Sequence, residues 1–294
     1  MRRPLLAALA LAAAACSATG GGSAVRGGTG GAALDAGLGD PDADIALDGA
    51  IDLDAAPGDG AAAQVAEVFG HSERTLYRLD PTTKAVKQVG SFNPPESVID
   101  IALDKQSNLY ATSFSGLWKV DKATAKLTLV KPGNYPNSLS FVPAGTVDAN
   151  AEALVGYDGS TYERIDPASG AISTIGTLGG GFTSSGDIVS VIGGPTYLTA
   201  HGPGCDTGDC LLEVNPATGD LVKNWGSLPY ASVFGLAFWA GSVYGFDDGG
   251  DIFEIQFLPG NPKPTTTPIP FAGALGLSYW GAGSTTSAPV SPVH

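Results

Sequence analysis

The stretch Leu76–Lys84 reads LYRLDPTTK, and its pattern returns four times along the chain. The later copies are LWKVDKATA at 117–125, YERIDPASG at 162–170, LEVNPATG at 212–219 and a degenerate IFEIQF at 252–257. Apolar and polar residues alternate in each copy, which predicts a strand with one buried face. An Asp or Asn before Pro favours a turn directly afterwards. The equivalent positions lie 41, 45, 49 and 41 residues apart: Asp80, Asp121, Asp166, Asn215 and Gln256.

Two further strands are expected before each copy, and one after it. The first of them is predicted at 98–103, 138–141, 187–191 and 235–239, and the second at 108–112, 153–157, 197–200 and 242–246. Four strands in about 45 residues are typical of a propeller blade. The repeats resemble the bacterial propeller repeats grouped with the YVTN and WD40-like families. That resemblance implies an all-β propeller over most of residues 65–294 and implies nothing about function.

The two ends of the repeat region predict a closed ring of five blades. Residues 65–70 read as a second strand that lacks a first strand before it. An apolar alternation at 274–280 supplies the missing strand, so the C-terminal strand should complete the blade that the N-terminal strand begins. Closure of this kind protects sheet edges from aggregation. The expected propeller spans 65–283, followed by a tail over 284–294.

Alternation in the innermost strands predicts which side chains face the channel. One face should pack between blades, because it is large and apolar: Ile101, Leu139, Ile188, Leu236 and Leu277. The other face is small, as a narrow channel requires: Ala102, Ser140, Val189, Ala237 and Ser278. Directly before these lies a column at the expected channel mouth: Asp100, Ser138, Asp187, Gly235 and Gly276.

The first 16 residues predict export. A charged start, MRRP, precedes an apolar run at 5–15 that is too short to span a bilayer. The run ends in Ala-Ala-Ala-Cys, which resembles a bacterial lipobox and implies that Cys16 is acylated. Ser17 after the cysteine implies the outer membrane or surface of the cell envelope. The alternative is ordinary secretion with cleavage nearby.

Residues 17–64 are expected to form a disordered tether. They contain eight aspartates, one arginine and no aromatic residue, so they cannot bury enough apolar surface to offset the ordering entropy. Asp40, Asp42 and Asp44 are spaced like a calcium loop, but Ile45 stands where such a loop needs glycine. The sequence therefore predicts no cofactor, with calcium as the alternative.

Charge and cysteine content narrow the partners. The net charge is −14, and residues 65–294 hold 21 acids against 12 bases, which argues against a nucleic-acid partner. Cys205 and Cys210 bracket a short stretch that can turn tightly, so an exported chain should form a local disulfide there. Zinc is the alternative, and only His201 lies near enough in sequence to assist.

The candidate site lies at the channel mouth. Asp100 and Asp187 are expected to converge there as a calcium site or an acid–base pair, or to accept backbone N–H groups in a purely structural role. Loops on the same face should add further ligand-binding candidates: His71, Phe114, Tyr157, Asp158, His201, Asp247 and Asp248. The aromatic residues Phe114, Tyr157, Trp239 and Phe246 are expected either to form a binding surface or to pack between blades.

No catalytic motif in the sequence names a reaction. Gly70–Arg74 (GHSER) lacks the closing glycine of a nucleophile elbow, and the three glycines at 179–181 precede no helix. The sequence therefore favours a membrane-anchored, non-enzymatic binding or scaffold propeller with a protein or glycan partner. The alternative is a hydrolase or lyase built on Asp100 and Asp187. The sequence does not indicate an oligomeric state.

Overall fold

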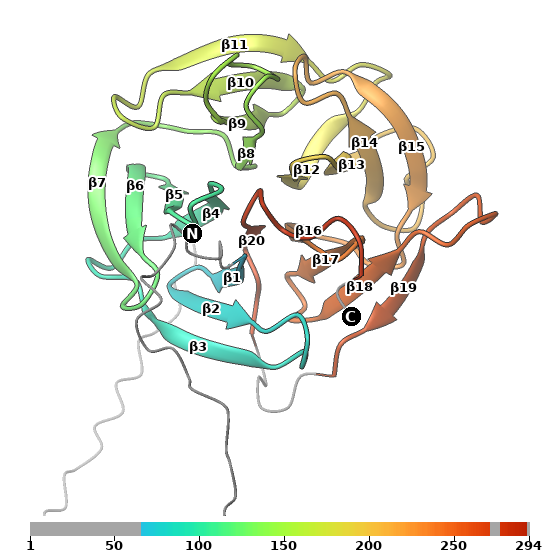
Figure 1. The fold of residues 1–294 in the computed structure, drawn as a ribbon, viewed down its shortest axis with the longest axis horizontal. Helices are drawn as coiled ribbons and strands as arrows, with labels where there is room; N and C mark the ends of the chain where they lie inside the picture. Colours follow the sequence, from blue (N-terminus) through green and yellow to red (C-terminus); the bar gives the residue numbers. More distant parts are fainter. Residues whose placement is uncertain (1–65, 271–276, 293–294) are drawn as a thin grey trace, which may run out of the picture. The chain divides into compact units, whose positions relative to one another are not determined.

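The computed structural model describes residues 66–270 and 277–292. Twenty β-strands and no helix occur in this part of the chain. They form five four-stranded antiparallel sheets around a central axis, which confirms the predicted five-bladed propeller (Figure 1). The same residues contain no helix that is long and apolar enough to cross a membrane. The predictions for the signal peptide, Cys16 and the tether over 17–64 lie outside the described residues.

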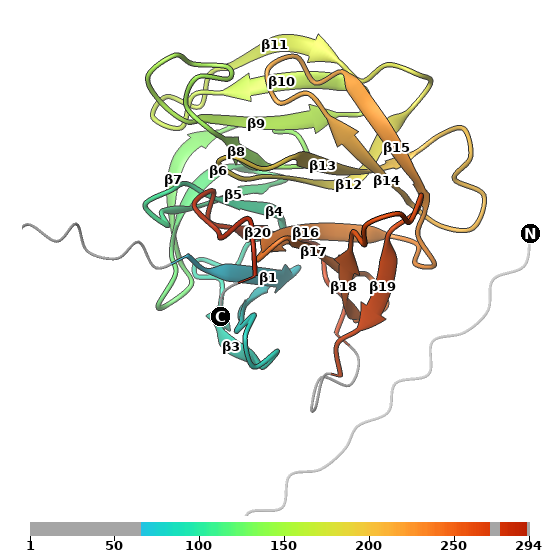
Figure 2. The ribbon, with the colours of Figure 1, turned by 45° about the vertical axis from the view of Figure 1, so that its right-hand side comes forward.

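Each blade runs from an innermost strand at the axis to an outermost strand at the circumference (Figures 1 and 2). Blade 1 contains β20 (Gly281–Ser284), β1 (Val68–Ser72), β2 (Thr75–Leu79) and β3 (Val86–Ser91). Blade 2 contains β4 (Val98–Leu103), β5 (Leu109–Ser113), β6 (Gly116–Asp121) and β7 (Lys126–Pro132). Blade 3 contains β8 (Ser140–Val142), β9 (Ala153–Asp158), β10 (Thr161–Ile165) and β11 (Ile172–Thr177). Blade 4 contains β12 (Thr183–Ser190), β13 (Thr196–His201), β14 (Cys210–Val214) and β15 (Leu221–Ser227). Blade 5 contains β16 (Val233–Trp239), β17 (Ser242–Asp247), β18 (Ile252–Gln256) and β19 (Thr265–Pro268).

The repeated phrase forms the third strand of each blade and the turn that follows it. Asp166 Oδ1 accepts hydrogen bonds from the N–H groups of Ala168 and Ser169 at 2.8 and 2.9 Å. These bonds lower the pKa of Asp166. Asp80 makes the same pair of bonds in blade 1, and the glycine that ends the blade 3 turn has a φ of 70°. The side chain thus fixes the turn locally, as expected for Asp before Pro.

The ring closes through the predicted pairing of the two ends of the propeller, but the closing strand lies later than expected. Strand β20 pairs with β1 through Gly281, Ala282 and Gly283, whereas the sequence favoured 274–280. The closing strand has room for few side chains, because a Cβ atom added to Gly281 would lie 2.4 Å from Asp100 Oδ1 and one added to Gly283 would lie 2.9 Å from Ile101 O. Part of the predicted stretch falls in residues 271–276, which are not described. Tyr279 does not pair as a strand residue but packs edge-on against Phe246, with the ring centroids 5.4 Å apart.

The closing strand also changes the end of the propeller. Ser284 lies within β20, and Thr285 and Thr286 are fully buried. The backbone N–H of Thr285 donates to Glu67 O at 3.0 Å. The structure therefore continues beyond the boundary expected at residue 283.

The apolar face of the innermost strands packs between blades. Ile101, Leu139, Ile188 and Leu236 are each at most 1% exposed, as predicted. Burial of each such side chain contributes roughly 1.5–3 kcal/mol. In blade 1 the equivalent position is Ala282 rather than Leu277, because the closing strand is shifted. The prediction that the small residues of the other face line a channel is not confirmed, because Ala102, Val189 and Ala237 are also buried in apolar clusters of the core.

Candidate functional site

Five equivalent residues form a ring where the innermost strands begin, here called the channel ring: Asp100, Ser138, Asp187, Gly235 and Gly281. Four of the five were predicted, and Gly281 takes the place of Gly276. The pairing register of the innermost strands shifts directly before Asp100 and Gly235 and around Asp187. Such irregularities turn side chains out of the regular alternation near functional sites. The described chain therefore brings the two aspartates together at the axis.

Asp187 accepts hydrogen bonds from backbone donors of two blades. Its Oδ1 accepts the N–H of Ile188 at 2.6 Å, and its Oδ2 accepts the N–H of Leu236 at 2.6 Å. The carboxylate is completely buried and links blade 4 to blade 5. Hydrogen bonds from two N–H groups favour the charged form. These bonds lower the pKa of Asp187, but burial has the larger effect and raises that pKa well above its usual range.

Asp100 accepts fewer hydrogen bonds from backbone donors than Asp187 does. Its Oδ1 accepts the N–H of Ile101 at 2.8 Å, whereas no donor of the described chain makes a well-directed bond to Oδ2. Burial raises the pKa of Asp100 well above its usual range, and the charge of Asp187 and a side-chain hydrogen bond with Asp187 raise it further. Like charges this close cannot both be ionised in a dry site. One proton is thus shared between the two carboxyl groups.

His71 faces this pair from blade 1. Its side chain is fully buried, and Nδ1 lies 2.9 Å from Ser72 O, so Nδ1 carries the proton and Nε2 is left as an acceptor. Burial lowers the pKa of His71 to about 4. A Cβ atom added to Gly281 would lie 2.4 Å from both His71 Nε2 and Asp100 Oδ1, so these two atoms are at most 4.8 Å apart, twice that distance. The imidazole is therefore neutral and sits beside Asp100.

A cavity of about 260 Å³ lies over the channel ring, here called the mouth cavity. The residue that precedes each member of the ring lines it, together with Phe114 from the β5–β6 hairpin: Ile99, Asn137, Gly186, Phe234 and Trp280. All five blades therefore contribute to it, and blade 2 contributes two residues, Ile99 and Phe114. Phe114 is 69% exposed, which is unusual for a side chain of this size. The indole N–H of Trp280 donates to Ser278 Oγ at 3.1 Å, so its polar atom is already used.

A second cavity of about 370 Å³ shares Ile99, Phe114 and Asn137 with the mouth cavity. It extends over blades 2 and 3 to the first strand of blade 4 and is more polar, with Asn134, Asp158 and Ser184 among its residues. The two cavities give the mouth an apolar, aromatic centre at the axis and a polar arm to one side.

The other predicted residues divide between this face and the core. Asp158 is exposed and lines the polar arm. The exposed His201 places Nε2 2.7 Å from Oδ1 of the buried Asp209. Asp247 is buried and accepts the N–H of Asp251 at 2.8 Å, and Asp248 accepts a hydrogen bond from Ser278 Oγ. Burial raises the pKa of Asp247.

Three of the four predicted aromatic residues lie away from the mouth. Tyr157 is fully buried, and its hydroxyl donates to Gly219 O at 2.6 Å in the next blade. Phe246 is 1% exposed and belongs to the core, and Trp239 lines a cavity near Ala66. Only Phe114 reaches the mouth. Packing between blades therefore accounts for Tyr157 and Phe246.

The predicted disulfide is present between Cys205 and Cys210, with the Cα atoms 5.2 Å apart. It closes the loop between β13 and β14, which also carries Asp209. Asp209 Oδ2 accepts the N–H of Val233 at 2.6 Å, so this loop is tied to the start of β16.

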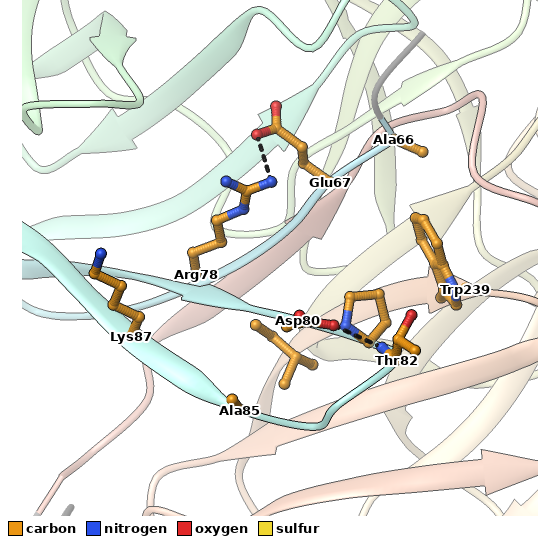
Figure 3. A pocket seen from close by; sticks show the side chains of 10 residues that line it. Ala66, Glu67, Arg78, Asp80, Thr82, Ala85, Lys87 and Trp239 are labelled. Carbon is orange, nitrogen blue, oxygen red and sulfur yellow. Dashed lines mark hydrogen bonds and ion pairs between the residues drawn. The ribbon is translucent and has the colours of Figure 1, made fainter. Parts of the chain in front are cut away.

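A cavity of about 480 Å³, larger than either cavity at the mouth, lies elsewhere (Figure 3). It lies between blades 1 and 5, where Trp239 stands across from Arg78 and Lys87. Most of its charged groups already have partners within the protein. Glu67 forms ion pairs with Arg78 at 3.2 Å and with Lys122, and Asp80 accepts hydrogen bonds from the N–H groups of its own turn. We therefore place the candidate site at the mouth, despite the smaller volume there.

Sequence reasoning missed Phe234, Asn137 and Trp280. A signal was available, because each directly precedes a residue of the channel ring. The closing strand was predicted at 274–280, which made Trp280 its last residue. In the structure Trp280 is the residue directly before that strand. Among residues 66–270 and 277–292 there is no group of three or more His, Cys, Asp or Glu side chains arranged to hold a metal ion.

Comparison with known proteins leaves the fold as the shared feature. No protein-family model matches the chain, and no curated protein matches it. Among solved structures, a protein of unknown function from Bacteroides caccae is similar over 73% of this chain and 77% of its own, with 10% identity and a TM-score of 0.36. A likeness this weak adds nothing to the fold that the strand order already defines.

Proposed function

We propose that this protein is a non-enzymatic binding propeller whose ligand occupies the mouth cavity. The observation that carries the proposal is the cavity of about 260 Å³ to which all five blades contribute, with Phe114, Phe234 and Trp280 in its wall. An aromatic, concave site with few polar groups on a rigid scaffold is the usual form of a binding site. A protein or glycan partner would place an apolar portion at the axis and polar groups over Asn134 and Asp158.

The buried aspartates support binding more than catalysis. Asp187 is fully engaged with backbone N–H groups, both aspartates are completely buried, and neither lines the mouth cavity. A general acid must come within hydrogen-bond reach of its substrate. The pair is better suited to holding blades 2, 4 and 5 together around the axis.

The cellular location of the protein is part of the same proposal. We infer that the chain is exported and held at the cell envelope through acylated Cys16, with residues 17–64 as a tether. The lipobox-like Ala13–Cys16 supports this, and so does the disulfide between Cys205 and Cys210, which is typical of an oxidising compartment.

The test is thermal unfolding of the full chain with glycans, peptides, organic cations, calcium and EDTA. A ligand at 100 times its Kd should stabilise the folded state by about 2.7 kcal/mol. The stabilisation should be lost in the double variant Phe114→Ala, Phe234→Ala. Val222→Ala is the matched control, because Val222 is 58% exposed on the outermost strand β15 and far from the mouth. Equal stabilisation of the wild type and the double variant would contradict the proposal.

A second candidate function is acid–base or metal-assisted hydrolysis at the channel. It is favoured by one observation, the convergence of two carboxyl groups whose pKa values are raised by burial, beside His71. This candidate requires a turnover that disappears in Asp187→Asn, or a melting temperature that rises with calcium and falls with EDTA. No turnover and no metal response in the wild type would eliminate it.

A further inference from the structure

The outermost strand of each blade has one edge without a partner strand, and proteins usually protect such edges. A free edge presents a row of backbone N–H and C=O groups that can pair with another chain, and lysine or proline on the edge opposes this. Four of the five outermost strands carry such residues: Lys87 in β3, Lys126, Lys131 and Pro132 in β7, Lys223 in β15 and Pro268 in β19. The fifth, β11, carries neither lysine nor proline.

The composition of β11 suits a strand that accepts a further strand. Its six residues, ISTIGT, include no charged side chain. Four of them are the β-branched residues isoleucine and threonine, which fit an extended strand. Ile172 is 41% exposed, and Ser173, Thr174 and Thr177 are exposed as well. The strand lies at the circumference of the ring, away from the axis (Figure 1), so its outer edge faces outward.

The outer edge of β11 has no hydrogen-bond partner within residues 66–270 and 277–292. In that part of the chain β11 pairs with β10 alone, and no backbone group outside the sheet bonds to residues 172–177. In blade 2, by contrast, Asn93 O accepts the N–H of Leu127 at 2.8 Å and so covers part of the edge of β7. A Cβ atom added to Gly176 would meet Thr218 O of the next blade, but this contact covers a face of β11 and not its edge.

A second copy of the chain supplies a matching strand. In an antiparallel pair both strands offer the same alternation of N–H and C=O groups, so a strand can pair with its own copy across a two-fold axis. Like charges opposite each other would oppose this pairing, and β11 has none. The charged side chains of the adjoining β10 are one acid and one base, Glu163 and Arg164. The edge is therefore a place where two copies, each with a net charge of −14, can approach.

We propose that β11 pairs antiparallel with β11 of a second copy, so that the two copies of blade 3 form one continuous sheet. The inference goes beyond the proposed function and does not depend on it, because no residue of β11 lines the mouth cavity or its polar arm. Six residues from each copy make a small interface, so the dimer is weak and depends on protein concentration. Salt favours it, because salt screens the repulsion between two acidic molecules.

The test is sedimentation velocity of the full chain over about 1 to 500 μM, the range of a weak dimer. The wild type should change from monomer to dimer, and added salt should move the change to lower concentrations. Thr174→Lys should raise the dissociation constant about tenfold, because it places a charge on the edge of both copies. The new charge lies opposite Glu163 in its own sheet, which favours folding. Leu129→Lys is the matched control, because Leu129 is the exposed equivalent of Thr174 in β7 and the change in net charge is the same.

A second substitution and a second measurement locate the contact. Ile172→Lys, at the start of β11, should weaken the dimer as Thr174→Lys does, and thermal unfolding of each variant checks that the propeller is intact. Amide hydrogen exchange of β11 should be slower at high protein concentration than at low. The proposal is overturned by a wild type that stays monomeric, by a dimer that survives both substitutions in β11, or by equal weakening in Leu129→Lys. Association that continues beyond the dimer also overturns it, because a two-fold pairing of edges closes on itself.

Discussion

At the scale of single residues, the channel depends on the absence of a side chain at Gly281. Asp100 Oδ1 and His71 Nε2 both lie 2.4 Å from the place where a Cβ atom would stand. Both groups are fully buried on separate blades, so neither can move away without disturbing its own strand. A glycine here thus allows a histidine and a carboxylic acid to meet across the closing strand.

Gly281→Ala should destabilise the protein by about 1–3 kcal/mol, the usual cost of overpacking a core. Urea unfolding followed by circular dichroism measures this. Gly179→Ala is the control, because no atom lies within 4 Å of the added methyl group. A loss of stability for Gly281→Ala no larger than that of the control would show that the strand shifts freely.

The shared proton of Asp100 and Asp187 makes stability depend on pH. Burial raises the folded pKa of Asp100 above its unfolded value, so the stability that it contributes is fully present below about pH 4 and is lost as pH rises towards the folded pKa. Asp100→Asn keeps a hydrogen-bond donor beside Asp187 and removes the titration. The variant should therefore gain stability relative to the wild type as pH rises from 4 to 8, by at most about 1.4 kcal/mol per pH unit.

Urea unfolding of both proteins at each pH unit between 4 and 8 tests this expectation. His71 has the opposite sign in both proteins, because its folded pKa is lowered to about 4 and its stability is lost as pH falls from about 6.5. That contribution cancels in the difference between the two proteins. A difference that stays flat with pH would mean that Asp100 is ionised in the folded state.

At the scale of elements, the loop between β13 and β14 is organised by one covalent bond and one buried carboxylate. The disulfide joins residues five apart, and Asp209 beside it binds Val233 N–H and faces His201. The loop thus positions the start of β16, and Phe234 of the mouth cavity follows Val233 directly.

Replacement of Cys205 and Cys210 by serine should cost about 2 kcal/mol, the value expected from loop-closure entropy for so short a loop. The same loss should appear in the wild type after reduction with a thiol reagent, which serves as the control. Unfolding by urea measures both. Wild type that is equally stable with and without the reductant would show that the disulfide contributes nothing.

At the scale of the whole molecule, the propeller depends on one short strand for closure. Strand β20 contributes four residues, yet it pairs with β1, contacts β16 and β4 on the neighbouring blades and carries the ring glycine. Without it, β1 would become the exposed inner edge of blade 1. Unpaired edges of this kind promote association between chains.

A chain that ends at Trp280 should therefore fail to form a monomeric, cooperatively unfolding propeller. Gel filtration should show aggregates, and thermal unfolding should lose its single transition. A chain that ends at Pro292 is the control and should behave like the full protein. A monomeric, cooperative protein that ends at Trp280 would show that closure is not required.

The sequence by itself determined the repeat, the number of blades, the turns, the apolar columns and the disulfide. Each rests on local chemistry: alternation along a strand, Asp before Pro, or two cysteines five residues apart. Asp100 and Asp187 were found because they occupy the same place in the repeat.

Only the tertiary structure decided where the ring closes and what its mouth looks like. The apolar stretch before β20 is the stronger strand pattern, yet the channel accepts only Gly-Ala-Gly-Ser, because neighbouring blades leave no room for side chains. The side chain of Tyr157 lies in the core, where its hydroxyl donates a hydrogen bond to the next blade. No local sequence pattern predicts this contact. Phe114, Phe234 and Trp280 come together because closure brings separate blades to one axis, and distances between blades are a property of the ring and not of any one repeat.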